Sequence, residues 1–252
     1  TARIERRRDL DQVQARARES WVQKVAATLH HELRTPLAEI AAYAELLAGT
    51  ERTMEAGEFD SIVLGLEHGV ARLAGLVADV LLLTDLQSGR ARTDFQARRR
   101  LCADWADVVR AVACRFEGSA RGRGLRLVTR CGDRGVVEAD PIFLADALAR
   151  LVDNAVKFSP RPGTTVRVSV AADDGGLAIR VTDEGVGIPE AAVPALFAPF
   201  HQVDRESQEQ QGLGNGLAIC RGLVALSGGE VAVQSRLGEG STFTIRLPGV
   251  TR

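Results

Sequence analysis

The sequence lacks long hydrophobic runs. No stretch approaches the roughly 18 apolar residues that a membrane-spanning helix requires, and no basic and apolar leader segment opens the chain. The chain begins with Thr1 rather than methionine. We therefore interpret it as part of a longer protein, and expect no membrane contact by the part given.

Cysteine is scarce and net charge is nearly absent. The four cysteines are Cys102, Cys114, Cys131 and Cys220. Their wide spacing fits neither a zinc nor a redox pair and indicates no disulfide framework, which favours a reducing cytosol. With 32 basic and 33 acidic residues, the chain lacks the basic excess of a nucleic-acid-binding protein. Its 252 residues, 45% of them hydrophobic, are enough for two domains.

A reactive octapeptide, residues 30–37, lies inside a long amphipathic helix predicted from about residue 3 to Leu47. The apolar stripe of that helix is Val22, Val25, Leu29, Leu33, Leu37, Ile40, Ala44 and Leu47. At about 100° per residue, His31 falls opposite the stripe and faces water, while His30 and Glu32 lie on its flanks. A neutral imidazole is a competent nucleophile, and the carboxylate of Glu32 can orient it or accept its proton.

Two further residues of the octapeptide have predicted effects. Thr35 follows His31 by one helical turn, where its hydroxyl could orient a water molecule. Pro36 removes one backbone hydrogen bond, which predicts a bend just beyond His31.

A second helix is predicted after the polar turn region 49–57 and runs to about Leu86. Its apolar residues repeat at intervals of three and four, the spacing of a packed bundle seam: Ile62, Leu66, Val70, Leu73, Val77 and Val80. Two helices cannot bury both stripes, so we predict a homodimeric four-helix bundle. Packing of both helices on a second domain of the same chain is the alternative. We expect residues 1–20 to be a helical extension that enters from a preceding part of the protein, residues 21–86 to be the bundle domain and residues 87–95 to be a linker.

Beyond the linker, residues 96–252 alternate between predicted helices and strands. Helices are expected at 104–116, 141–158 and 216–226, and strands at 125–130, 165–170, 177–182, 231–235 and 242–247. This order predicts helices on one face of a mixed, largely antiparallel sheet, a two-layer α/β sandwich.

Four short motifs in this second region have the chemistry of a nucleotide site. Asn154 and Lys157 share a helix face, so an amide oxygen for Mg²⁺ and an ammonium for phosphate can meet one triphosphate. Asp183 ends a predicted strand before Gly185 and Gly187, and its carboxylate can accept a hydrogen bond from the exocyclic amine of adenine. The segment from Gly212 to Leu217 reads Gly-x-Gly-x-Gly before a helix, which exposes backbone N–H groups for phosphates.

The motifs occur in the order found in sensor histidine kinases. Residues 31–37, His-Glu-Leu-Arg-Thr-Pro-Leu, resemble their phosphoacceptor motif. Residues 153–160, Asp-Asn-Ala-Val-Lys-Phe-Ser-Pro, resemble the N box of the ATP-binding domain that they share with DNA gyrase and mismatch-repair ATPases. The G1 box is matched by residues 183–189, the F box by residues 197–202 and the G2 box by residues 212–217. Residues 203–211 are polar and suit the lid over the nucleotide. The resemblance covers about residues 20–248.

This resemblance implies ATP-dependent autophosphorylation of His31, transfer to an aspartate of a response regulator, and phosphatase activity through Thr35. It also implies that the chain is the catalytic half of a longer protein, with residues 1–20 continuing from a sensor module that is either soluble or membrane-spanning. The implied cofactors are ATP and Mg²⁺, with Asn154 toward the metal. The implied nucleotide-binding residues are Asn154, Lys157, Phe158, Asp183, Gly185, Gly187, Ile188, Phe197, Phe200, Gly212, Leu213, Gly214, Asn215, Gly216 and Leu217.

Several alternatives stay open at this point. His30 competes with His31 as the acceptor. A protein that is mainly a phosphatase, and a dimeric scaffold whose nucleotide site controls only its shape, are the two other functional classes. Two residues depart from the family pattern, because Arg150 stands where an asparagine is frequent and Asn215 where a leucine is common.

Overall fold

The structure, a computed structural model, describes residues 2–49, 56–132, 135–159, 162–173, 176–201 and 213–250, with side chains of the first helix described from residue 26. It divides into two compact units, with the boundary inside the second helix between Val80 and Leu81. Because the placement of the two units relative to each other is not determined, each is described by itself.

The order of elements agrees closely with the predicted one. The helices are α1 (Ala2–Gly49), α2 (Ala56–Ser88), α3 (Arg90–Arg98), α4 (Ala106–Gly122), α5 (Pro141–Lys157) and α6 (Gly216–Leu226), with a 3-10 helix η1 (Glu190–Ala195). The strands are β1 (Arg100–Cys102), β2 (Arg126–Cys131), β3 (Val137–Ala139), β4 (Thr165–Asp173), β5 (Gly176–Asp183), β6 (Glu230–Arg236) and β7 (Gly240–Leu247).

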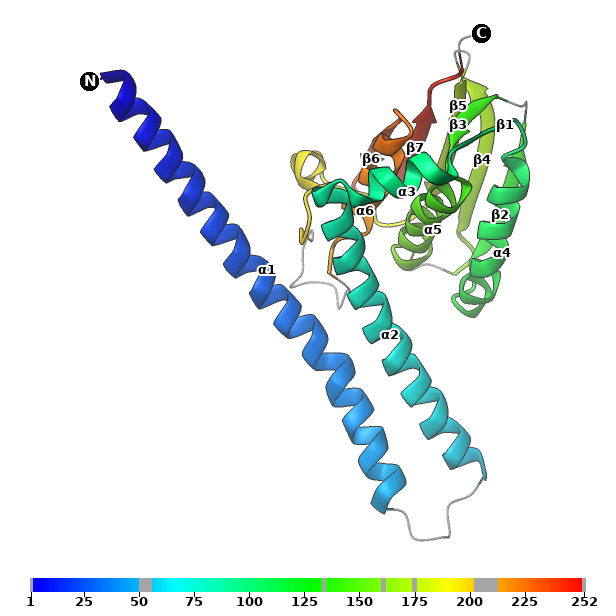
Figure 1. The fold of residues 1–252 in the computed structure, drawn as a ribbon. Helices are drawn as coiled ribbons and strands as arrows, with labels where there is room; N and C mark the ends of the chain where they lie inside the picture. Colours follow the sequence, from blue (N-terminus) through cyan, green and yellow to red (C-terminus); the bar gives the residue numbers. More distant parts are fainter. Residues whose placement is uncertain are drawn as a thin grey trace. The chain divides into compact units, whose positions relative to one another are not determined.

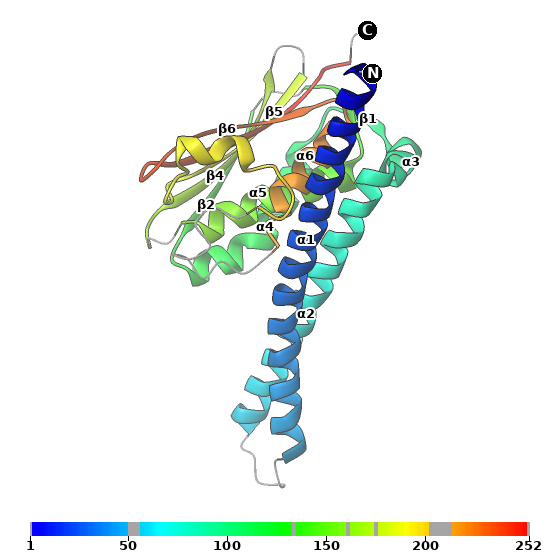
Figure 2. The same ribbon diagram turned by 90° about the vertical axis from the view of Figure 1, so that its left-hand side faces the viewer.

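The first unit is an antiparallel helical hairpin of α1 and the part of α2 up to Val80 (Figures 1 and 2). The helices approach closely because α2 has glycines at the contact: a Cβ on Gly65 would collide with the ring of Tyr43, and one on Gly69 would lie 2.8 Å from Ile40 Cγ1. The helix α1 continues without interruption through Pro36. A continuous helix can still be bent, so the bend predicted after His31 stays a prediction.

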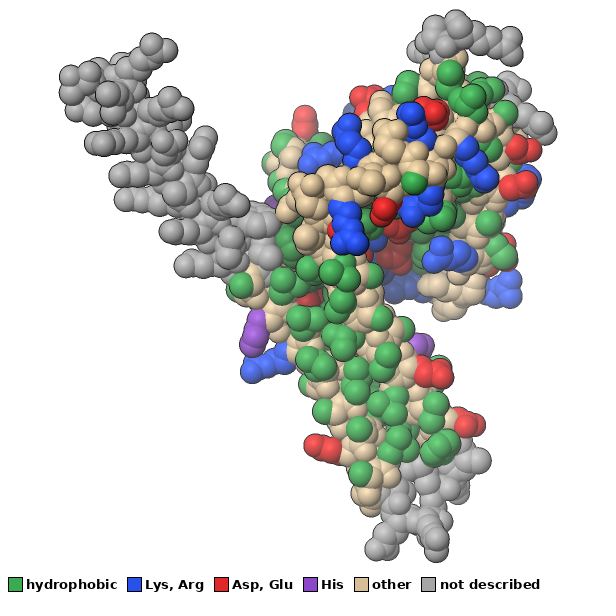
Figure 3. Space-filling view, viewed as in Figure 1, with side chains coloured by type: hydrophobic (Ala, Val, Ile, Leu, Met, Phe, Trp, Pro, Cys, Tyr) green, Lys and Arg blue, Asp and Glu red, His purple; other side chains and the backbone are tan. Residues whose placement is uncertain are grey.

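The hairpin buries only part of its apolar surface. Among the described side chains of α1, from residue 26 on, the buried ones are Thr28, Glu32 and Pro36, which lie beside the predicted stripe rather than on it. Large apolar side chains remain exposed along both helices of the hairpin: Leu37, Leu46, Phe59, Leu64, Val70 and Val77 are each 47 to 54% exposed. Figure 3 shows hydrophobic side chains gathered along this part of the molecule. The single hairpin therefore leaves an apolar face without a cover.

The second unit is a two-layer α/β sandwich built on a five-stranded sheet of order β2-β4-β5-β7-β6. The pair β2 and β4 is parallel, and the other three pairs are antiparallel. Helices α4, α5 and α6 contact the strands and one another, and Figure 2 shows them on one face of the sheet. Fully buried residues of α5 and β5, among them Leu148, Val152 and Ile179, form the middle of the core. The predicted fold of one layer of helices on a mixed sheet is confirmed.

The C-terminal turns of α2 belong to the second unit. Leu83 is buried in its core, and a Cδ1 atom of Leu86 lies 2.7 Å from where a Cβ on Gly222 of α6 would be. Gly89 then ends α2 with φ 82°, and α3 follows with Ala91 and Phe95 buried. Residues 87–95, predicted as a linker, thus comprise the end of α2, Gly89 and much of α3.

Four short elements were not predicted. Besides α3 and η1, these are strands β1 and β3, which pair with each other in a two-stranded antiparallel sheet. Near this sheet Arg98 Nε donates to Asp140 Oδ2 at 2.8 Å, and Asp140 caps α5 by accepting from the N–H of Ile142 at 2.9 Å. These contacts fasten α3 to the sandwich through a buried carboxylate.

Candidate functional site

The phosphoacceptor candidate lies on the exposed face of α1. The side chain of His31 is 71% exposed, and its Nδ1 lies 3.8 Å from Oε1 of Glu32, whose side chain is 6% exposed. Both His30 and His31 are exposed, so exposure alone does not distinguish them. The contact with Glu32 favours His31, because a carboxylate near Nδ1 leaves Nε2 of the same ring as the outward nitrogen.

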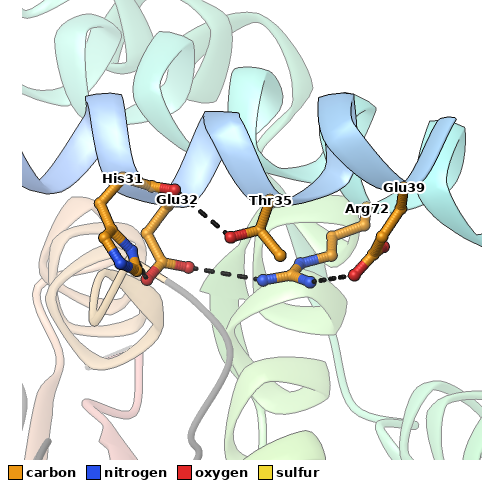
Figure 4. A network of polar contacts seen from close by, with 5 residues as sticks. All are labelled: His31, Glu32, Thr35, Glu39 and Arg72. Atoms are coloured by element: carbon orange, nitrogen blue, oxygen red, sulfur yellow. Dashed lines mark hydrogen bonds and ion pairs between the residues drawn. The ribbon is translucent and has the colours of Figure 1, made fainter. Parts of the chain in front are cut away.

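An arginine of α2 completes this cluster, which Figure 4 shows. One terminal nitrogen of Arg72 lies 3.7 Å from Oε2 of Glu32, and the other lies 3.5 Å from Oε1 of Glu39. The Glu32 carboxylate is therefore held between an imidazole and a guanidinium. Sequence reasoning missed Arg72, because its position opposite Glu32 depends on the register of the two helices.

Thr35 faces the backbone of the acceptor. Its Oγ1 donates to the carbonyl oxygen of His31 at 3.5 Å, the distance of a weak hydrogen bond (Figure 4). The hydroxyl thus lies one turn from the imidazole, as the spacing predicts, and rotation about χ1 can direct it toward solvent beside the ring.

We expect Arg72→Met to lower the rate of His31 phosphorylation by roughly ten- to a hundredfold, since the buried carboxylate loses the cation that orients it. ATP affinity should not change, because Arg72 belongs to the hairpin, whereas Asn154, Lys157 and Asp183 belong to the sandwich. Labelling rates at saturating ATP, with Glu39→Gln as the control that keeps the Arg72–Glu32 contact, check this. An unaltered rate in Arg72→Met would show that Glu32 needs no such support.

In the second unit, Asp183 ends β5 as a buried carboxylate. Its Oδ1 accepts from the N–H of Gly185 at 2.9 Å and from that of Ser241 at 3.2 Å. Burial raises the pKa of Asp183, and these two hydrogen bonds lower it by less. Within the part of the chain that the structure describes, no hydrogen bond involves Oδ2, which leaves that oxygen for the amine of a ligand.

Glycines form the backbone surroundings of this carboxylate. A Cβ on Gly185 would collide with the carbonyl of Phe158, and one on Gly240 would collide with the carbonyl of Asp183. The N–H of Val186 also donates to the Phe158 carbonyl at 3.2 Å, which joins the end of the N box to the G1 loop. Gly240 and Ser241 were missed from the sequence, although Gly-Glu-Gly-Ser before the last strand was an available signal.

The other predicted nucleotide residues differ in their exposure to solvent. Asn154 is half-buried on α5, while Lys157 is exposed and paired with Asp153. Phe197 and Leu213 are buried, and Ile188, Phe200 and Leu217 are half-buried. Gly187 and Gly214 have φ of 68° and 69°, and Asn215 is the N-cap residue that precedes Gly216. Gly212 and the predicted lid at 203–211 lie outside the described residues.

The residues present fit Mg²⁺ bound through ATP better than a metal held by protein alone. Among the described residues, no three His, Cys, Asp or Glu side chains gather as a metal-binding group. Mg²⁺ commonly keeps several waters and takes one or two protein ligands plus substrate phosphates. A single half-buried amide, that of Asn154, is consistent with this arrangement.

Comparison with known proteins identifies the family. Residues 22–89 match the His Kinase A (phospho-acceptor) domain, and residues 139–251 match the histidine kinase-, DNA gyrase B- and HSP90-like ATPase domain. The chain belongs to the sensor histidine kinases and contains their catalytic core, with the acceptor domain followed by the ATPase domain.

Relatives and solved structures agree with this assignment. The histidine protein kinase DivJ of Caulobacter vibrioides is 32% identical over 251 residues, which are 97% of this chain and 41% of DivJ. The full-length ShkA crystal structure in complex with AMPPNP is 31% identical, with TM-score 0.64, over 90% of this chain and 46% of ShkA. The Acinetobacter baumannii kinase AdeS shares the fold at 24% identity, with TM-score 0.66 over 88% of this chain and 98% of AdeS. The chain spans less than half the length of its curated relatives.

No described helix is both long enough and apolar enough to cross a bilayer.

Proposed function

We propose that the protein transfers the γ-phosphoryl group of ATP to His31 and from there to an aspartate of a response regulator. The observation that carries the proposal is the exposed imidazole of His31 beside the buried carboxylate of Glu32, which Arg72 holds in place. The same chain has an ATPase domain with a buried aspartate, Asp183. These are the acceptor and the adenine-binding group of one phosphoryl transfer.

In the proposed reaction, Nε2 of His31 attacks the γ-phosphorus while the bond to the ADP oxygen breaks. The ring proton on Nδ1 passes toward Glu32, which lies on that side of the imidazole. Mg²⁺, when bound with ATP, neutralises charge on the phosphates. Asn154 would face the metal, Lys157 would exchange Asp153 for a phosphate oxygen, and backbone N–H groups at 214–216 would bind phosphate at the start of α6.

Within the nucleotide site, Oδ2 of Asp183 would accept from the exocyclic amine of adenine, which selects ATP over GTP. Phe158 and Ile188 would flank the nucleotide, and Phe197 and Phe200 would pack over it. The remaining cofactor-binding positions, Gly185, Gly187, Gly212, Leu213 and Leu217, would shape the surrounding loops.

We further propose that the hairpin forms a homodimeric four-helix bundle. The exposed apolar residues of both helices, such as Leu37 and Val70, would be buried by a second copy of the chain. An upstream sensor module and a receiver domain are the other partners proposed, and the cytoplasm the compartment.

Incubation with γ-labelled ATP tests the proposed activity. We expect acid-labile, alkali-stable label on the protein and its passage to a receiver domain. Protein that binds ATP but takes up no label would refute the kinase and favour the scaffold alternative.

Phosphatase activity toward the regulator is the second activity proposed, with Thr35 orienting the attacking water. Thr35→Ala should leave His31 labelling unchanged and slow dephosphorylation of the regulator at least tenfold, because the positioned hydroxyl is lost while the acceptor remains. Decay of a phosphorylated receiver domain measures this effect. Thr35→Ser is the control, and equal decay rates for Thr35→Ala and the wild type would refute the role.

A further inference from the structure

Asn215 occupies the last position before α6, in the Gly-x-Gly-x-Gly loop. It is 1% exposed, and its Oδ1 accepts a hydrogen bond from the backbone N–H of Phe200 at 2.9 Å. The leucine that is common at this position can fill similar space but cannot accept a hydrogen bond. The departure from the family pattern therefore adds a contact between the G2 loop and the F box.

The residue held by this contact has an unfavourable backbone conformation. Phe200 has φ of 59°, and among the described residues it is the one non-glycine with positive φ. A bulky side chain in the left-handed region costs free energy and persists where its surroundings hold it. The backbone N–H of this same residue donates the hydrogen bond that Asn215 accepts.

The F box has a second attachment to the same helix. The guanidinium of Arg221, on α6, donates to the carbonyl of Phe197 at 3.0 Å and lies 5.4 Å from the centre of the Phe197 ring. Both ends of the aromatic pair are thus fixed to α6, one near its N-terminus and one a turn and a half further on.

Burial of the side-chain amide of Asn215 also costs free energy. Its Nδ2 is buried and has no hydrogen-bond partner within the described part of the chain. A buried donor without a partner lowers the free energy of unfolding, and a leucine would avoid this cost. This cost offsets the stabilisation from the Phe200 hydrogen bond, so a role in binding is the better reason for an asparagine here.

We propose that Asn215 is a positioning residue for the nucleotide, acting through Phe200. The inference rests on the proposed function. Phosphates bound by the N–H groups of residues 214–216 would fix the loop that carries Asn215, and Asn215 fixes the backbone of the F box. Binding of the triphosphate and placement of the aromatic pair are then linked by one side chain.

The test is Asn215→Leu in the full 252-residue chain. We expect the KM for ATP in autophosphorylation to rise at least fivefold, while the thermal unfolding midpoint without nucleotide stays unchanged or rises. The amide proton of Phe200 should exchange with solvent at least tenfold faster. A purely structural asparagine predicts a lower midpoint, and that result would overturn the inference, as would a KM or an exchange rate equal to the wild type.

Two further variants sharpen the test. Asn215→Asp keeps an oxygen acceptor for Phe200, so protection of that amide should be retained. Ala225→Leu places a leucine on the exposed face of α6 and should alter none of the three measurements. Wild-type protein without label would refute the proposed kinase, whereas a labelled wild type with an indistinguishable Asn215→Leu would refute only the role of Asn215.

Discussion

His31→Gln should abolish acid-labile, alkali-stable labelling from γ-labelled ATP. The physical reason is that glutamine keeps a polar side chain on the helix but has no imidazole nitrogen to form an N–P bond. ATP binding should be unchanged, because Asn154, Lys157 and Asp183 lie in the other compact unit. Calorimetric titration of the variant with ATP and the labelling assay together measure both expectations.

His30→Gln is the matched control, since it makes the same substitution one residue away at a position that is also exposed. We expect its label to be close to that of the wild type. Label that survives in His31→Gln and disappears in His30→Gln would move the acceptor by one residue and would separate it from the Glu32 contact.

Asp183→Asn should weaken ATP binding by roughly 1.5 to 3 kcal/mol, the contribution of a hydrogen bond to a charged group. Asparagine has nearly the shape of aspartate and can still accept from Gly185 and Ser241, so the fold should persist. The variant loses the charged acceptor that would face the adenine amine. Titration with ATP, with GTP as the comparison, measures the loss, and an ATP affinity equal to the wild type would contradict the assignment.

The Asp183 carboxylate also makes the affinity for ATP depend on pH. Because burial raises the pKa of Asp183, the carboxyl takes up its proton at a higher pH than an exposed aspartate. ATP affinity should therefore fall as the pH is lowered toward this raised pKa. The linked effect on folding has the opposite sense: the free energy of unfolding decreases as the pH rises from the usual aspartate range through the raised pKa. Asp183→Asn should remove both dependences.

The fold could be predicted from the sequence wherever hydrophobic periodicity was sustained. The long helices α1 and α2, the core helix α5 and the hairpin of β4 and β5 all have such patterns, and their predicted limits agree with the structure within a few residues. The short elements were missed for a physical reason. Strands β1 and β3 have three residues each, too few to show a period, and their pairing joins segments that lie far apart in the chain.

The sequence motifs of the site could be predicted, but the residues that hold its side chains in place could not. Asp183 was recognisable because it ends an apolar strand before two glycines. The N–H of Ser241, which donates to that carboxylate, and the guanidinium of Arg72, which forms an ion pair with Glu32, come from other strands and helices. They therefore depend on register rather than on local pattern. The hydrogen bond that Asn215 accepts from Phe200 belongs to the same class, since only its unusual residue type was visible beforehand.

The position of Leu83 and Leu86 has a consequence for how this protein can recombine with others. These side chains are encoded within the acceptor-domain match at 22–89, yet they pack with the unit that contains the ATPase domain. The end of α2, which belongs to the acceptor domain by sequence, therefore completes the hydrophobic core of the ATP-binding domain. A chimera that joined this ATP-binding domain to another kinase after α3 would lose part of its own core, whereas a junction between Val80 and Leu81 would keep that core intact.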